Sequence, residues 1–249
     1  HVLLSLPTAQ REAGGGLHAA WTLEGLGQLD VDLVLRLLVD PHPRVRENAA
    51  QLAERWASQW PVNERLSALA DDPDAAVRWQ AALSLGAWDN DGVLTPLAKI
   101  ARAGAADRWT RLAIATAVPT RAGKLIPKIE DLVLVRELSS LVGARRDPAE
   151  TGALLKTLAA ADVRRRAAII NGLSEGSSRR GVQLSALLDT LPEAASAREI
   201  LGAAAAVALE TARPLEERLD AVRLLVHVPW ETASPVFEKL LALQDPPEL

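Results

Sequence analysis

The chain has 249 residues, a formal net charge of −4 and an aromatic content of only 3%. The negative charge disfavours nucleic-acid binding through overall charge, although local basic clusters remain compatible with it. The low aromatic content argues against an all-β fold, because strands favour aromatic and β-branched side chains. No apolar run approaches the roughly 20 residues of a membrane-spanning helix, so we predict no membrane span.

The chain contains neither cysteine nor methionine, and it begins at His1. Without cysteine it can form no disulfide, no thiolate metal site and no covalently attached c-type haem. We expect it to be a fragment of a longer chain, and the missing leader then carries no information about localisation.

In chain order, the predicted helices begin with an apolar segment over 17–27, for which Gly27 is a natural stop. Asp30 starts the next helix, and the Asp40-Pro41 turn leads into the one after it. The helices expected after Asp30 span 30–38, 45–56, 75–86, 94–103, 107–115, 148–158, 162–173, 194–209, 214–226 and 235–243. A partner of the 45–56 helix begins at Pro61, and the segment over 125–142 is long and apolar-rich.

The helix that follows Asp71-Asp72-Pro73-Asp74 shows the pattern most clearly. Asp72 or Asp74 is placed to cap its free N–H groups, which favours capping over cation binding for these carboxylates. One apolar face is formed by Val77, Ala81, Leu85 and Trp88, which recur at helical spacing. Ala82 and Gly86 are small, so a neighbouring helix is expected to approach closely there.

The same pattern recurs along the chain. Val45-Arg46 with Ala49-Ala50 matches Val77-Arg78 with Ala81-Ala82 at an offset of 32 residues. A degenerate copy covers 107–115, and the signature returns over 162–173. This repeat resembles the HEAT repeat, with a period shorter than the usual range of about 40–47 residues. The sequence therefore predicts an all-α fold over 1–249: one right-handed α-solenoid of about six or seven HEAT-like helical hairpins.

Four phrases carry a more specific resemblance, at 17–27, 107–111, 141–150 and 172–181. In this order they resemble the HEAT-repeat section of large exported haem-binding CxxCH, membrane-bound dehydrogenase-like proteins of planctomycetes and related bacteria. That family joins a dehydrogenase-like β-propeller, a helical repeat section and a C-terminal c-type cytochrome domain. The resemblance covers about 17–245 but includes no CxxCH, so no functional residue is carried over.

The resemblance implies a non-catalytic scaffold, a protein-interaction segment that acts as the spacer between dehydrogenase-like and cytochrome domains. It implies a periplasmic or exported location, partners that are other domains or subunits, and no cofactor on this chain. The c-type haem, and any haem-dependent dehydrogenase activity, would belong to the parent protein.

Histidines offer no ligand or acid–base pattern. They are scattered at His1, His18, His42 and His227, and none shares a helix face with a second ligand. We therefore assign them structural or solvated roles.

Arginines give the strongest functional signal. We expect them at the ends of consecutive helices, either as a solvated edge with local ion pairs or as an interaction patch for an acidic partner or a phosphate. The candidate patch comprises Arg145, Arg146, Arg164, Arg165, Arg166, Arg179 and Arg180.

An alternative function is a HEAT-like nucleic-acid-binding protein or DNA glycosylase-like enzyme. Some HEAT-like enzymes act on damaged DNA through a basic concave face with Trp and Asp, and here Trp79, Trp88 and Trp109 are the candidates. A net acidic chain grips a duplex poorly, however, and we expect the tryptophans to fill gaps between alanine-rich helices instead.

Overall fold

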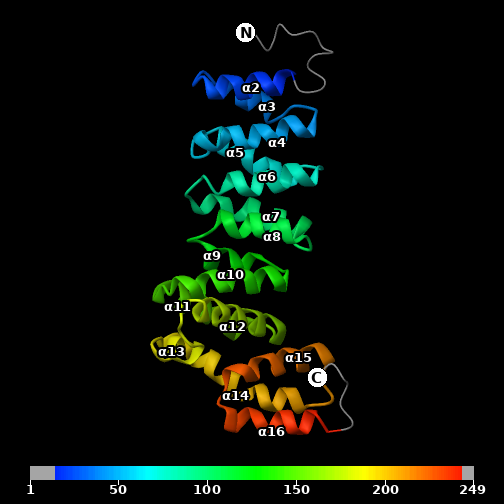
Figure 1. Ribbon diagram of the computed structural model, residues 1–249, viewed down its shortest axis with the longest axis vertical. Helices are drawn as coiled ribbons and strands as arrows, with labels where there is room; N and C mark the ends of the chain where they lie inside the picture. The colour runs from blue at the N-terminus through cyan, green and yellow to red at the C-terminus, as the bar shows by residue number, and fades with distance from the viewer. Residues whose placement is uncertain (1–14, 243–249) are drawn as a thin grey trace. The chain divides into compact units, whose positions relative to one another are not determined.

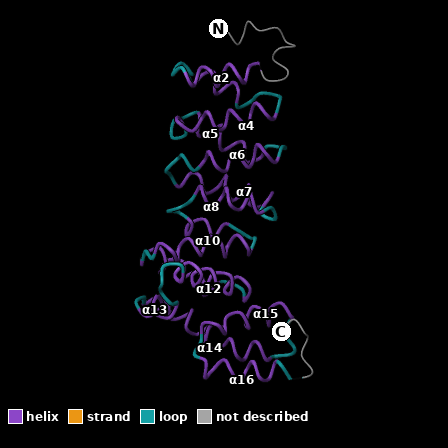
Figure 2. Tube along the Cα trace, in the orientation of Figure 1, coloured by secondary structure: helices purple, strands orange, loops and turns teal. Residues whose placement is uncertain are grey.

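The computed structural model describes residues 15–242, and every regular element in that range is a helix (Figure 2). Within it, no helix is long and apolar enough to cross a membrane. The chain divides after Val118 into two compact units, which are described separately. The predicted fold class, an all-α solenoid of helical hairpins, is confirmed. Its right-handed sense and its extent as one solenoid over 1–249 stay predictions.

Unit 1 stacks helices in two rows. One row contains every second helix, in the order α2, α4, α6 and α8, and each of these contacts the next (Figure 1). The other row is made of α3, α5 and α7. The α-helices of unit 1 are α2 (Gly15–Gly25), α3 (Val31–Leu37), α4 (Pro43–Leu52), α5 (Val62–Ala68), α6 (Ala75–Leu85), α7 (Leu94–Gly104) and α8 (Arg108–Ala117). Its 3-10 turns are η2 (Ala53–Trp56), η3 (Leu69–Asp71) and η4 (Asp91–Val93).

Helix α6 packs as its apolar spacing predicts except at Trp88, which follows the end of the helix and is partly exposed. Val77, Ala81 and Leu85 are completely buried. Asp74 is the N-cap, and its carboxylate accepts hydrogen bonds from the N–H groups of Ala76 and Val77. A Cβ at Gly86 would lie only 2.9 Å from the Cα of Ala117, so the predicted close approach of a neighbouring helix is confirmed.

The tryptophans do not fill the core, so that prediction was wrong. Trp60, Trp109 and Trp230 expose 78%, 56% and 68% of their surfaces, and the other four are also at least partly exposed. The core consists of leucine, isoleucine, valine and alanine. Between rows of closely spaced helices, these side chains fill the space that an indole would overpack.

Unit 2 has less regular helix lengths. Its α-helices are α9 (Ala122–Leu125), α10 (Leu132–Arg145), α11 (Pro148–Lys156), α12 (Val163–Ser178), α13 (Leu184–Asp189), α14 (Ala195–Leu209), α15 (Leu215–Leu224) and α16 (Trp230–Leu240). Its 3-10 turns are η5 (Ile126–Lys128), η6 (Thr157–Ala160), η7 (Pro192–Ala194) and η8 (Leu225–His227).

Helices α10 and α12 are in backbone contact through three glycines. A Cβ at Gly172 would lie 2.3 Å from the carbonyl oxygen of Arg136, and one at Gly176 would lie 2.0 Å from that of Ser140. A Cβ at Gly143 would meet the carbonyl oxygen of Leu173 at 2.3 Å. Later residues of α10 thus lie beside later residues of α12, so the two helices run parallel and their C-terminal ends are neighbours.

Candidate interaction surface

The seven candidate arginines form two groups and not one patch. Arg164, Arg165 and Arg166 lie in the first turn of α12, whereas Arg179 and Arg180 follow its last residue. At 1.5 Å per residue, the two ends of this helix are about 20 Å apart. The expected placement at the ends of consecutive helices was therefore wrong for these five residues, because α12 continues through Ser178 without a break.

The group at the start of α12 is engaged within the chain. Arg164 forms ion pairs with Glu216 and Asp220, at 3.5 and 3.7 Å. Arg165 donates hydrogen bonds to the backbone carbonyls of Ile126 and Ile129. Arg166 donates to those of Leu158 and Ala159, at 2.9 and 3.1 Å. Arg164 thus links α12 to helix α15, and Arg165 and Arg166 link it to the turns at η5 and η6.

The group at the helix ends is less engaged. Arg145 contacts the Pro119 carbonyl and the Glu150 carboxylate, and its burial lowers the pKa of its guanidinium. Arg146, Arg179 and Arg180 are exposed, and the side chains of these three have no polar partner among the described residues. Because α10 and α12 run parallel, Arg145, Arg146 and Arg180 line one open depression of about 770 Å³ together with Thr120, Ala144 and Asp147.

Arg146 ends α10 in an unusual backbone conformation. Its φ and ψ of 58° and 30° are left-handed, a conformation that glycine adopts at far lower cost. Retaining arginine at such a position costs about 1 kcal/mol. The side chain that this strained residue presents lines the depression.

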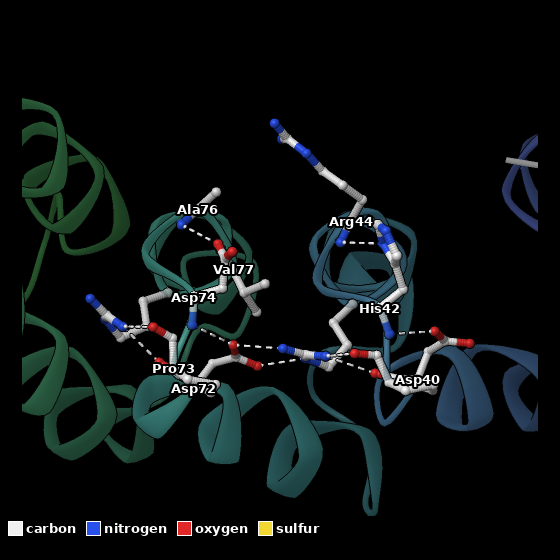
Figure 3. Close-up of polar contacts among 11 residues, drawn as sticks. Asp40, His42, Arg44, Asp72, Pro73, Asp74, Ala76 and Val77 are labelled. Carbon is white, nitrogen blue, oxygen red and sulfur yellow. Dashed lines mark hydrogen bonds and ion pairs between the residues drawn. The ribbon is translucent and has the colours of Figure 1, made fainter. Parts of the chain in front are cut away.

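A ladder of polar contacts links the turns of unit 1 (Figure 3). The guanidinium of Arg46 binds Asp72 through two hydrogen bonds, at 2.7 and 2.9 Å. It also donates to the carbonyls of Asp40 and Pro41, at 2.8 and 3.0 Å. One side chain thus closes its own turn and reaches the turn of the next repeat.

Asp72 completes this contact as an ionised carboxylate. Burial by itself would raise its pKa, but the hydrogen bonds from Arg46 and from the Asp74 N–H outweigh burial and lower it. His42 has the position that Asp74 has in the next repeat: its Nδ1 accepts from the Arg44 N–H and caps α4, which is a structural role.

A second depression, of about 550 Å³, lies between the starts of α6 and α8 and the end of α7. Trp79 and Trp109 both line it, and the indole N–H of Trp79 donates to the Trp109 carbonyl at 3.2 Å. Asp107 is also in this depression, where it caps α8 by accepting from the N–H and hydroxyl of Thr110. Of the three tryptophans proposed for a DNA-binding groove, two are therefore together, while Trp88 lies apart and covers Gly92.

His227 is the one histidine in a polar network of unit 2, and sequence patterning did not indicate it. Its Nδ1 and Nε2 lie 3.2 Å from the Ser174 hydroxyl and 3.0 Å from the Asn171 side-chain oxygen. Burial lowers its pKa, although Glu175 opposes this shift. His18 is exposed, and His1 lies outside the described residues. Over 15–242, no group of three or more potential ligands is placed to hold a metal ion.

Comparison with known proteins identifies the repeat in unit 1. Residues 31–118 match the family model of HEAT repeats. Over this range the chain is similar to HEAT repeats. The matched range contains the Arg46–Asp72 ladder and the 32-residue offset on which the HEAT resemblance rested. No curated protein and no solved structure matches the chain.

Proposed function

We propose that this chain acts as a protein-interaction scaffold and not as a catalyst. HEAT arrays commonly present extended surfaces to other proteins, and this chain carries such repeats. The observation that carries the proposal is the depression at the ends of α10 and α12, with Arg146 and Arg180 unpaired in it. A left-handed arginine in place of glycine is a local cost that a binding role explains.

The partner favoured by this surface is an acidic face of another domain or subunit. Two guanidinium groups without internal carboxylates are free to form charge-assisted hydrogen bonds with such a face. The resemblance to the haem-binding CxxCH proteins supplies the context. We propose a periplasmic parent protein in which this chain is the spacer between a dehydrogenase-like domain and a c-type cytochrome domain. The haem would reside in the cytochrome domain.

The context is tested on the native protein from which the chain comes. We expect an intact mass well above 26.6 kDa and a c-type haem absorption band. A mass near 26.6 kDa with no chromophore would contradict the parent-protein proposal while leaving the interaction role to be tested by itself.

The interaction role is tested by Arg146→Gly in the intact parent protein. The change relieves the left-handed backbone, so it should stabilise unit 2 by about 1 kcal/mol while weakening the domain contact. The contact is measured by cross-linking between this chain and the neighbouring domains, with Arg180→Gln as a second variant. The matched control is Arg36→Gln with Arg65→Gln. Both residues are exposed and lie in unit 1, and neither lines the depression. Unchanged cross-linking in Arg146→Gly and Arg180→Gln would refute the role of this surface.

A second function, nucleic-acid binding, is favoured by one observation: Trp79, Trp109 and Asp107 share a depression. A gel-shift titration with a labelled duplex containing an abasic site tests it. We expect no retardation at physiological salt, because the net charge is −4 and Asp107 is used as a helix cap.

A further inference from the structure

The polar ladder of unit 1 lacks one contact at Arg78, so part of this guanidinium has no partner among residues 15–242. Arg78 donates through one Nη to the carbonyls of Asp72 and Pro73, at 2.7 and 3.0 Å. Arg46 makes the same contact with Asp40 and Pro41. The two side chains therefore start from equivalent positions in successive repeats.

The difference lies in the next turn. Arg46 uses its Nε and second Nη to bind the Asp72 carboxylate. In the following repeat, Arg111 donates to the carbonyls of Ala105 and Ala106, which puts Ala105 where Asp72 stands one repeat earlier. An alanine has no carboxylate to offer. Over residues 15–242, the Nε and second Nη of Arg78 accordingly have no hydrogen-bond acceptor.

These free donors are accessible. Arg78 is partly exposed, and it lines two adjoining depressions of about 550 and 410 Å³. The larger one also contains Trp79 and Trp109, and its lining is mainly apolar, with Ile100 and several alanines. The unpaired donors thus lie at the edge of an apolar surface formed by two indoles.

The acidic groups around Arg78 already have partners. Asp72 is bound by Arg46, and Asp107 accepts from Thr110. In the smaller depression, Asp71 forms an ion pair with Lys99 at 2.6 Å. None of these carboxylates is the ligand of the free Arg78 donors, so a ligand with its own negative charge would complete the fork.

We infer that Arg78 binds the carboxylate of an Asp or Glu side chain in a partner protein segment, which lies across Trp79 and Trp109. The carboxylate would take the place that Asp72 occupies on Arg46, with two parallel hydrogen bonds. An apolar residue next to the acidic one would contact the indoles. A free carboxylate ion would satisfy the fork alone, whereas a polypeptide also covers the adjoining apolar surface, and we therefore commit to a protein segment.

This inference rests on the proposed interaction function, but its site is in unit 1 and shares no residue with the depression of Arg146 and Arg180. The decisive variant is Ala105→Asp, which supplies the missing carboxylate from within the chain. Ala105→Asn is the matched control, because it has the same shape but no charge. The site accepts an aspartate by analogy with Asp72, which is ionised and only 9% exposed in the equivalent turn.

The probe is an array of blocked heptapeptides with a central Asp between apolar residues, paired with the same array carrying Asn. Binding to the full chain is measured by fluorescence polarisation. Asp peptides should bind the unaltered chain and Ala105→Asn, with no comparable binding of Asn peptides. Ala105→Asp and Arg78→Gln should each weaken binding by about tenfold or more, since a hydrogen bond to a charged group is worth at least one factor of ten.

Thermal unfolding supplies an independent readout that needs no ligand. Ala105→Asp should melt about 2 °C or more above Ala105→Asn, and the gain should vanish in the Arg78→Gln background. Equal binding of Asp and Asn peptides, or Asp-peptide binding that Ala105→Asp and Arg78→Gln leave unchanged, would overturn the inference. A failure confined to Arg146→Gly and Arg180→Gln would instead overturn the proposed function and leave the Arg78 site standing.

Discussion

The two units differ in the balance of contacts between neighbouring helices. Unit 1 links successive turns through side chains, as in the contact of Arg46 with Asp72. Unit 2 brings α10 and α12 into backbone contact at Gly143, Gly172 and Gly176. Side-chain links fix the distance between repeats while leaving most helix positions free to vary. Glycine contacts fix the distance between neighbouring helices at positions where a larger residue does not fit.

This difference explains where the repeat is recognisable. The HEAT match covers 31–118, which lies within unit 1, where Asp and Arg recur at a fixed offset. In unit 2 the α10–α12 contact depends on small residues at irregular positions, which leave a weaker repeat pattern. The difference between the units predicts how each responds to a substitution. Hydrogen exchange resolved by peptide measures the protection of each unit separately.

The largest effect is expected for Leu85→Asp in unit 1. Leu85 is completely buried, and an unpaired carboxylate there should cost about 4 kcal/mol or more. The measurement is hydrogen exchange of α4, α6 and α8, with Val133→Asp as an exposed control in unit 2. Unchanged protection in unit 1 would contradict the register of α6.

The next effect is expected in unit 2, for Gly176→Ala. The new Cβ would lie 2.0 Å from the Ser140 carbonyl oxygen, so α10 and α12 must separate, at a cost of about 2–3 kcal/mol. Gly202→Ala is the matched control, because nothing lies within 4 Å of its Cβ position. That control should stabilise the helix by up to about 1 kcal/mol. If both variants behave alike in chemical denaturation, glycine contact does not hold this pair.

A smaller effect is expected when the ladder of unit 1 loses a carboxylate. Asp72→Asn removes the ionised partner of Arg46, and we expect a loss of about 1–2 kcal/mol. Because the pKa of Asp72 is lowered in the folded state, its contribution is complete above the ordinary aspartate pKa of about 4 and disappears as the pH falls further. Urea denaturation from pH 7 to pH 3 should therefore show a steeper acid loss for the unaltered chain than for Asp72→Asn. Parallel curves would be the contrary result.

The smallest effect concerns His227 in unit 2. Burial lowers its pKa, so the unfolded chain takes up the proton first as the pH falls. The contribution of His227 to the free energy of unfolding is complete above about pH 6.5. Below that pH the free energy of unfolding falls with pH, by no more than about 1 kcal/mol. His227→Gln should remove this slope between pH 7 and pH 5. A slope that persists in the variant would assign the proton uptake to another group.

Sequence patterns predicted the helices and their buried faces better than they predicted the positions of surface side chains. The helix over 75–85, an aspartate cap at its start and its buried face follow from local rules, since each depends on residues within a few turns. The structure decided that Asp74, and not Asp72, is the cap. The tryptophans were misplaced, because whether an indole fits the core depends on the distance between helices. The arginines were grouped wrongly, because an unbroken α12 separates residues that are close in sequence.

The sequence by itself determined the helices and the repeat of unit 1. Apolar spacing and capping residues act over one or two turns, so they can be read without knowing what packs against them. Only the tertiary structure decided which polar groups remain available for a partner. The parallel contact of α10 and α12 brings Arg146 to Arg180, and Ala105 leaves Arg78 without the carboxylate that Arg46 has. Both results depend on residues about 30 positions apart, which only packing brings together.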